Sequence, residues 1–224
     1  MSATSPTIAE QVTTLQRGMA TQLPTDIREA FAAELAGLDG SGLPATVVIG
    51  SPMPDGDLLD AHGQPTTLVR TRQGAPAVVV FYRGAWCPFC NLTLRTYQQQ
   101  LADELTAEGV VMVAISPQKP DGSLTMQENH QLTYPVLSDP GNQIAGALGI
   151  LTAPRDETRV AQAKLGLDVT SVNADGSTAM PMPTVALVDA GGTLRWIDVH
   201  PNYTTRTEPQ AILAAVHTHL APRT

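Results

Sequence analysis

The feature that most constrains the fold is an apolar segment that runs directly into a pair of cysteines. Residues 78–82 read Val-Val-Val-Phe-Tyr, and a short turn then leads to Cys87-Pro88-Phe89-Cys90. A continuous apolar run of this length predicts a central strand that is covered on both faces. Apolar residues at helical spacing follow Cys90. We therefore expect a strand, a turn and a helix, with both cysteines at the start of the helix.

A second strand and a hairpin extend the predicted sheet. The helix is expected over residues 88–108, and the apolar run at residues 110–115 predicts a second buried strand. Strand, helix and strand at this spacing form a βαβ unit, so the two strands should be parallel. Residues 185–189 and 193–199 flank an Ala-Gly-Gly turn and predict a β-hairpin. These patterns predict an α/β fold with a central mixed sheet flanked by helices.

Shorter patterns predict the remaining elements. Two short strands are expected at residues 58–60 and 66–69, joined by a turn that contains Gly63. The other expectations, in chain order, are a helix at 121–133, a strand at 134–137, a helix that starts near Asp139, a helix at 158–165, an irregular segment at 169–182 and a last helix from Thr207 to Leu220.

The N-terminal residues are predicted to be helical. Thr25 and Asp26 form a helix start, and apolar residues at helical spacing follow until glycines at positions 37, 40 and 42 end the pattern. Residues 1–20 predict a further helix or a loose arm. Because this segment is too short to bury a core of its own, we expect an extension over residues 1–45 and one domain over residues 46–224.

Composition limits the classes of function. The 224 residues carry a net charge of −8, which argues against a nucleic-acid partner and against binding to an anionic membrane surface. No run of about 18 apolar residues predicts a transmembrane helix. Residues 1–10 lack the basic and apolar regions of a secretory signal. We therefore expect a cytoplasmic protein, in which a lone cysteine pair is more often catalytic or metal-binding than structural.

The position of the cysteines predicts thiol chemistry. A cysteine in the first turn of a helix faces unpaired backbone N–H groups and the positive end of the helix dipole, which lower its pKa. Cys87 is expected there, with Arg83 adding positive charge nearby. Cys90 is expected one turn deeper, within reach of Cys87. We therefore expect an exposed nucleophile, Cys87, and a more buried partner, Cys90.

Two other interpretations of the cysteine pair are weaker. A structural zinc site needs about four protein ligands, whereas the chain has two cysteines and five scattered histidines. An inert buried pair is the second alternative. A Cys-x-x-Cys motif near a βαβ pattern favours a redox role.

Pro183 enters a predicted strand, and a cis Met182–Pro183 bond would fix its loop beside the thiols.

Four segments together resemble a known family. They are residues 81–92 (Phe-Tyr-Arg-Gly-Ala-Trp-Cys-Pro-Phe-Cys-Asn-Leu), 114–118 (Ala-Ile-Ser-Pro-Gln), 135–139 (Pro-Val-Leu-Ser-Asp) and 203–209 (Tyr-Thr-Thr-Arg-Thr-Glu-Pro). From about Gly50 to Leu220 the chain resembles the peroxiredoxin-like proteins of the alkyl hydroperoxide reductase/thiol-specific antioxidant (AhpC/TSA) group, within the thioredoxin superfamily.

The resemblance implies a thioredoxin-like fold and a peroxide substrate. It implies that Cys87 attacks the peroxide and becomes a sulfenic acid, and that Cys90 resolves it as a Cys87–Cys90 disulfide. A thioredoxin-type thiol donor would then reduce the disulfide. The resemblance further implies that no cofactor is needed and that the protein is a homodimer. Pro183 corresponds to the superfamily's cis-proline position.

The sequence also departs from the peroxiredoxin pattern around the cysteines. Peroxiredoxins carry Pro-x-x-x-Thr/Ser-x-x-Cys, and counted back from Cys87 those positions hold Val80 and Gly84. Their arginine before the late strand falls near Pro183. We expect Arg83 or Arg206 to supply the missing positive charge.

Three functions therefore follow from the sequence. The first is a thiol-dependent peroxidase that reduces hydrogen peroxide or organic hydroperoxides through Cys87 and Cys90. The second is a thioredoxin-like dithiol–disulfide oxidoreductase, which the motif from Trp86 to Cys90, together with Pro183, favours. The third is a non-enzymatic redox sensor or binding module, whose N-terminal arm would dock a partner.

Overall fold

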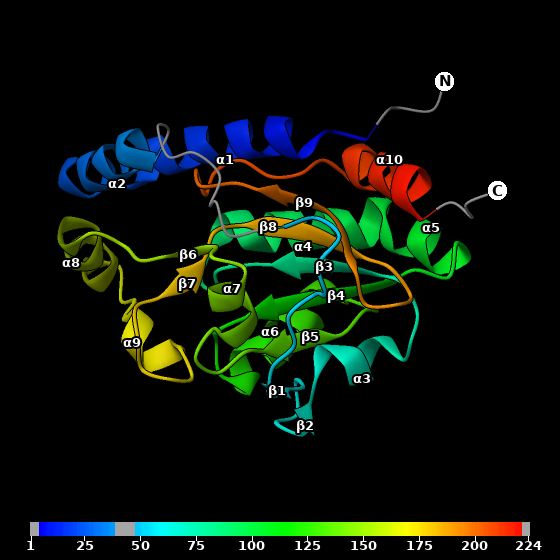
Figure 1. Ribbon diagram of the computed structural model, residues 1–224. Coiled ribbons are helices and arrows are strands. Elements are labelled where there is room, and N and C mark those ends of the chain that lie inside the picture. The colour runs from blue at the N-terminus through cyan, green and yellow to red at the C-terminus, as the bar shows by residue number, and fades with distance from the viewer. Residues whose placement is uncertain (1–4, 39–47, 221–224) are drawn as a thin grey trace.

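The computed structural model describes residues 5–38 and 48–220. It shows a main sheet between two layers of helices (Figure 1). The strands are β1 (Leu58–Leu59), β2 (Pro65–Thr66), β3 (Ala77–Phe81), β4 (Val111–Ser116), β5 (Val136–Ser138), β6 (Leu151–Thr152), β7 (Met180–Pro181), β8 (Thr184–Val188) and β9 (Leu194–Val199). Strands β6 and β7 form a separate two-stranded sheet. The helices are α1 (Ile8–Gln22), α2 (Thr25–Leu38), α3 (Leu68–Arg72), α4 (Pro88–Gln100), α5 (Ala102–Ala107), α6 (Pro120–His130), α7 (Gln143–Ala147), α8 (Asp156–Lys164), α9 (Val169–Val172) and α10 (Pro209–His219).

Residues Ala77–Phe81 form the predicted central strand β3, and Tyr82 follows its end. Within the described residues, the strand order of the main sheet is β2-β1-β5-β4-β3-β8-β9. Strand β3 pairs in parallel with β4 and antiparallel with β8, so the βαβ unit, the hairpin and the mixed sheet are all confirmed. Every residue of β3 is buried.

Alternation along β3 divides the core between the two faces of the sheet. Val78 and Val80 pack into a cluster with α1, α4, α5 and α10, whereas Val79 and Phe81 pack into a second cluster with α3 and α7. This division follows from the two-residue period of a strand. The cysteines belong to the first cluster, on the face that carries α4 and α1.

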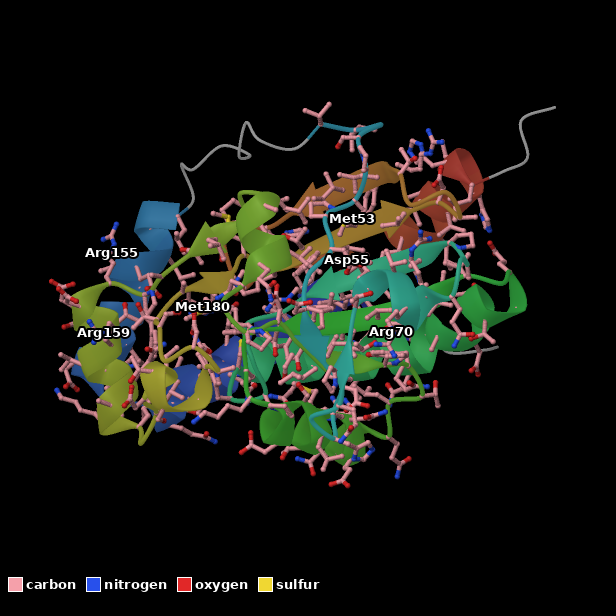
Figure 2. All side chains as sticks on the ribbon, turned by 60° about the horizontal axis from the view of Figure 1, so that its bottom comes forward. Met53, Asp55, Arg70, Arg155, Arg159 and Met180 are labelled. Carbon is pink, nitrogen blue, oxygen red and sulfur yellow. The ribbon has the colours of Figure 1, made fainter. Side chains whose placement is uncertain are left out.

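Three elements differ from the sequence prediction. Residues 66–69 do not continue as a strand, because the Thr67 hydroxyl caps the start of helix α3. The Asp55 carboxylate adds a second cap by accepting hydrogen bonds from the Leu68 and Val69 N–H groups (Figure 2). The helix expected over residues 88–108 breaks at Leu101, whose backbone leaves the helical region with φ −136°. The segment at 169–182, expected to be irregular, contains α9 and β7, and β7 pairs with β6.

The N-terminal helices pack on the rest of the chain. Helix α1 begins with a capping box between Thr7 and Glu10 and buries Ile8 and Val12 in the core cluster beside α4. Helix α2 lies against α8, and Figure 2 shows Arg155 beside α2. The predicted boundary at residues 45 and 46, with the glycines at 40 and 42, lies outside the described residues.

Candidate active site

The turn between β3 and α4 depends on a glycine. Gly84 has a φ of +149°, a conformation that side chains rarely adopt. A Cβ at this position would collide with Nε1 of Trp86 and would lie 2.7 Å from Oε1 of Gln118. The position where the peroxiredoxin pattern carries a hydroxyl therefore has no room for any side chain in this chain.

Two amides hold the turn in place, and the sequence prediction missed both. The side-chain oxygen of Gln118 accepts a hydrogen bond from the Ala85 N–H. Asn91 Nδ2 donates to the carbonyl oxygens of Ala85 and Cys87, at 2.7 and 2.9 Å, and His130 contacts Asn91 Oδ1 at 2.8 Å. Gln118 and Asn91 both lie in segments that carried the family resemblance, which was the available signal.

Cys87 and Cys90 lie at the start of α4, as predicted. Cys87 is the N-cap residue, Pro88 opens the helix, and Cys90 is its third residue. Both thiols are free, and each residue is only 1% exposed. The expectation that Cys87 is exposed is wrong, because Tyr203 and residues from α1, α2 and α8 surround the cavity that Cys87 faces.

Arg83 and Arg206 both lie near the cysteines. The Arg83 side chain is buried, donates from Nε to Met180 Sδ at 2.9 Å, and lies 4.1 Å from the ring centre of Tyr203 and 5.1 Å from that of Trp86. Within the described residues its guanidinium forms no salt bridge. Arg206 donates from Nη2 to Cys90 Sγ at 3.4 Å. Cys90 therefore has a guanidinium group in direct contact with its sulfur.

Arg206 is held in this position by backbone groups. Its Nη1 donates to the carbonyl oxygens of Tyr203 and Thr205, at 2.5 and 2.6 Å. Pro183 lies close by, because it lines a small cavity of about 10 Å³ together with Cys90 and Arg206. The described peptide bonds are all trans, so the Met182–Pro183 bond does not have the cis form considered from the sequence.

The two thiols have opposite pKa shifts. Burial opposes ionisation at both. At Cys90 a hydrogen bond from Cys87, the Arg206 guanidinium, and the backbone and charge of Arg83 outweigh burial and lower the pKa to about 5. At Cys87, burial, the hydrogen bond to Cys90 and the negative charge there raise the pKa well above its usual range. The pair titrates as a unit that loses one proton easily and keeps the other.

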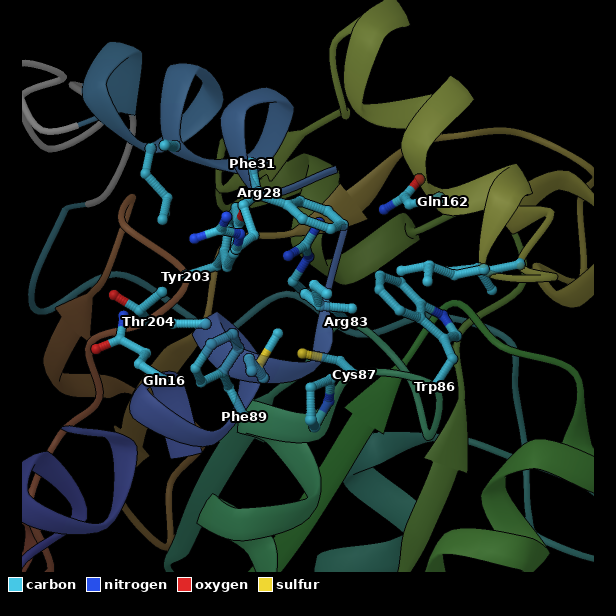
Figure 3. A pocket seen from close by; sticks show the side chains of 18 of the residues that line it. Gln16, Arg28, Phe31, Arg83, Trp86, Cys87, Phe89, Gln162, Tyr203 and Thr204 are labelled. Carbon is cyan, nitrogen blue, oxygen red and sulfur yellow. The ribbon is translucent and has the colours of Figure 1, made fainter. Parts of the chain in front are cut away.

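A cavity of about 630 Å³ opens in front of Cys87. Figure 3 shows the Cys87 sulfur turned toward it, with Arg83 and Tyr203 on the same side and Arg28 and Phe31 entering from α2. Of the residues predicted from the sequence, Arg83, Trp86 and Cys87 line this cavity. Cys90, Pro183 and Arg206 line the small one. Tyr203 was missed, although it begins the 203–209 motif.

Two further findings concern metals and membranes. Among the described residues, no three His, Cys, Asp or Glu side chains come together in a way that could hold a metal ion. No helix in residues 5–38 and 48–220 is long and apolar enough to cross a bilayer.

Solved structures of peroxiredoxins share this fold. Peroxidoxin BcpB of Mycobacterium tuberculosis is 21% identical with a TM-score of 0.56, and the match covers 79% of this chain and 98% of that one. Reduced Prx3 of Vibrio vulnificus in complex with H₂O₂ is 18% identical with a TM-score of 0.60, covering 76% and 99%. At these identities the likeness establishes the fold, and it confirms the thioredoxin-like architecture.

Sequence comparison gives the family. A protein of Mycobacterium tuberculosis (strain ATCC 25618 / H37Rv) named as a peroxiredoxin is 36% identical over 100 residues, which cover 45% of this chain and 62% of that protein. The chain thus spans less than two thirds of that relative. Residues 49–197 match the family model described as the AhpC/TSA family, which accounts for most of the sheet and both cysteines. The chain therefore belongs to the AhpC/TSA family.

Proposed function

We propose that this protein is a thiol-dependent peroxidase that reduces hydroperoxides through Cys87 and Cys90. The observation that carries the proposal is the arrangement of the pair, with one sulfur facing a large cavity and the other in contact with a guanidinium. Membership of the AhpC/TSA family supports it. So does the likeness to the Vibrio vulnificus structure, which holds H₂O₂.

The first step forms a sulfenic acid on Cys87. The reduced pair carries one proton, which lies on Cys87 in a hydrogen bond to the Cys90 thiolate. Transfer of that proton to Cys90 leaves a Cys87 thiolate facing the cavity, in the manner of a nucleophile activated by an adjacent base. The thiolate attacks the terminal oxygen of ROOH, so that an S–O bond forms and the O–O bond breaks. RO⁻ leaves as ROH by taking the proton held on Cys90, which restores the Cys90 thiolate.

The second step closes the disulfide. The Cys90 thiolate attacks the Cys87 sulfur and expels hydroxide, which solvent protonates to water. The two thiols have then lost two electrons and the peroxide has gained them. A dithiol donor of the thioredoxin type restores the pair by exchange through a mixed disulfide, and its own thiols are oxidised.

The arginines supply positive charge where negative charge develops. Arg206 stabilises the thiolate at Cys90, and Arg83 lies between two aromatic rings on the cavity side, where the alkoxide would form. Positioned donors of this kind often provide the largest single contribution to catalysis. They replace the hydroxyl that Gly84 cannot offer.

Membership of the AhpC/TSA family favours a hydroperoxide over a protein disulfide as the main substrate. We further propose that the enzyme works in the cytoplasm, where thioredoxin-type donors are available, and that it is a homodimer. The extension at residues 1–45 and the domain at residues 46–224 form one functional unit in this proposal. Light scattering of the purified chain measures the oligomeric state.

Cysteine variants test the proposal. After one equivalent of hydroperoxide, Cys90→Ser should give a trapped sulfenic-acid adduct on Cys87 by intact mass, and wild type should give the disulfide. Cys87→Ser should react slower by about two orders of magnitude or more. If Cys87→Ser gives a sulfenic-acid adduct on Cys90 as readily as Cys90→Ser gives one on Cys87, Cys90 would be the residue that attacks the peroxide. If peroxide does not oxidise the cysteines of the wild type, the peroxidase proposal is refuted.

A further inference from the structure

The guanidinium that contacts Cys90 comes from an irregular loop. Arg206 lies between β9 and α10, is half-buried, and within the described residues forms no salt bridge. Its Nη1 donates to two carbonyl oxygens of the same loop, those of Tyr203 and Thr205. A long side chain loses conformational entropy when it is held in one position. The contact with Cys90 therefore depends on what fixes the backbone of this loop.

The Asp198 carboxylate is the acceptor at which the fixing hydrogen bonds meet. Asp198 lies at the end of β9, and His200 Nε2 lies 3.1 Å from its Oδ2. The Thr207 hydroxyl lies 2.9 Å from the same oxygen. The hydrogen bond from His200 and, against burial, that from Thr207 hold the pKa of Asp198 below its usual range. An ionised carboxylate only accepts hydrogen bonds, so both groups donate to it.

Thr207, the residue after Arg206, is held on two sides. It is 3% exposed, and its hydroxyl is bound to Asp198 on β9. Its carbonyl oxygen accepts a hydrogen bond from the hydroxyl of the fully buried Tyr97 at 2.7 Å. Tyr97 belongs to α4, the helix that carries Cys90. The backbone next to Arg206 is therefore attached both to the sheet and to the helix of the thiol that Arg206 contacts.

The residue before Arg206 is held by His200. The His200 Nδ1 lies 2.8 Å from the Thr205 hydroxyl. The backbone N–H of His200 donates to the Pro183 carbonyl oxygen, also at 2.8 Å. His200, Pro183 and Arg206 line the same small cavity as Cys90. His200 therefore connects the loop to the strand entry beside the sulfur.

We propose that Asp198 and His200 are positioning residues, which hold Arg206 against the Cys90 sulfur through the two flanking threonines. The inference deepens the proposed peroxidase, on which its catalytic meaning rests. In that reaction the guanidinium stabilises the Cys90 thiolate that accepts the proton of the nucleophile and later closes the disulfide. Both positioning residues lie beyond residues 49–197, the region that matches the family model.

The first test removes the hydroxyl that donates to Asp198. Thr207→Val keeps the shape of the side chain but cannot donate, whereas Thr207→Ser retains the hydroxyl. At a pH below the Cys90 pKa, Thr207→Val should lower the thiolate fraction, measured by its absorbance, about two- to tenfold, and Thr207→Ser should keep the wild-type titration. Thr96→Val is the control, because Thr96 is equally buried and its hydroxyl donates to the Leu92 carbonyl oxygen within α4. It should leave the titration unchanged even if stability falls.

Double variants show whether the effect passes through Arg206. In Arg206→Gln, adding Thr207→Val should give no further change in the Cys90 titration, because the group that the hydroxyl positions has been removed. His200→Ala, which removes the contact with Thr205, should likewise raise the Cys90 pKa in wild type and not in Arg206→Gln. A wild-type titration in Thr207→Val, or an equal change in both backgrounds, overturns the positioning role.

Asp198→Ala tests the inference independently, and the half-buried position favours a folded variant. Removal of a negative charge would by itself lower the pKa of a nearby thiol, whereas release of Arg206 raises the pKa of Cys90. A rise supports the positioning role, and a fall or an unchanged value contradicts it. These titrations need no peroxide, so they can fail while the protein reduces hydroperoxides. Conversely, cysteines that peroxide does not oxidise would refute the peroxidase and leave the positioning role standing.

Discussion

The two cysteines share one turn of α4 but face different surroundings. Cys87 lines a cavity of about 630 Å³ with an apolar wall from the N-terminal helices. Cys90 lines a cavity of about 10 Å³, next to Arg206, Pro183 and His200. The first environment provides access, whereas the second provides stabilisation of charge. In this structure the sulfur that a substrate can reach differs from the sulfur that ionises most easily.

This division explains how a fully buried thiol pair can remain reactive. A buried charge is costly unless it is paired and hydrogen-bonded. The Arg206 guanidinium meets that need at Cys90, and the Cys87 thiol donates a further hydrogen bond to the Cys90 thiolate. Arg206 lines the small cavity together with Cys90 and does not line the large cavity that Cys87 faces.

The largest expected effect comes from disrupting the turn at Gly84, which connects β3 to the helix that carries both cysteines. Gly84→Ala forces a Cβ against Trp86 and Gln118 at a φ of +149°, which should destabilise the fold by about 2–4 kcal/mol and abolish most activity. Urea unfolding and peroxidase rate measure both effects. Gly37→Ala is the matched control: its Cβ meets only the flexible guanidinium of the exposed Arg155, so stability should not fall, and the higher helix propensity of Ala should raise it by up to about 1 kcal/mol. Equal losses in the two variants would show that the turn is not special.

The next effect concerns the charge at Cys90. Against burial, the hydrogen bond from Cys87, the Arg206 guanidinium and Arg83 together lower the pKa of Cys90 to about 5. Arg206→Gln removes the second of these contributions, so the pKa should rise. Each unit of that rise reduces the thiolate population about tenfold at pH values below the pKa. The rate loss should therefore be larger in acid than in alkali, where the thiolate forms without help.

Thiolate absorbance against pH checks this directly. Arg159→Gln serves as the control, because Arg159 is an exposed residue of α8 that pairs with Asp156. A Cys90 titration that is the same in Arg206→Gln and wild type would contradict the assignment of the charge to the Arg206 contact.

The sequence predicted the elements whose patterns are local. The apolar runs of β3 and β4 and the turn of the β8–β9 hairpin were sufficient, because burial on both faces and a Gly-rich turn leave direct traces in composition. The Cys-x-x-Cys motif likewise placed both thiols at the start of α4. The break at Leu101 left no such trace, since no proline or glycine marks it.

The environment of the thiols could not be predicted in the same way. Cys87 is covered by residues about 50 to 120 positions away in the chain, such as Phe31 and Tyr203. Cys90 receives its cation from Arg206, which is separated from it by 116 residues. Amphipathic spacing predicted that α2 is a helix, but not the surface on which it would pack. Tertiary packing decided which cysteine is accessible and which is charged.

The smallest expected effect concerns the attachment of the cavity wall. Glu208→Gln removes the negative charge of the carboxylate that accepts hydrogen bonds from the Ile8 and Ala9 N–H groups at the start of α1. The free energy of unfolding should fall by about 1 kcal/mol. Because the loss is local, hydrogen exchange in α1 should accelerate more than exchange in β3. Lys164→Gln, which breaks the exposed Lys164–Asp26 pair between α8 and α2, should give no measurable change. If exchange rises equally in α1 and β3, the extension unfolds only with the whole domain, and the Cys87 side of the site is as rigid as the Cys90 side.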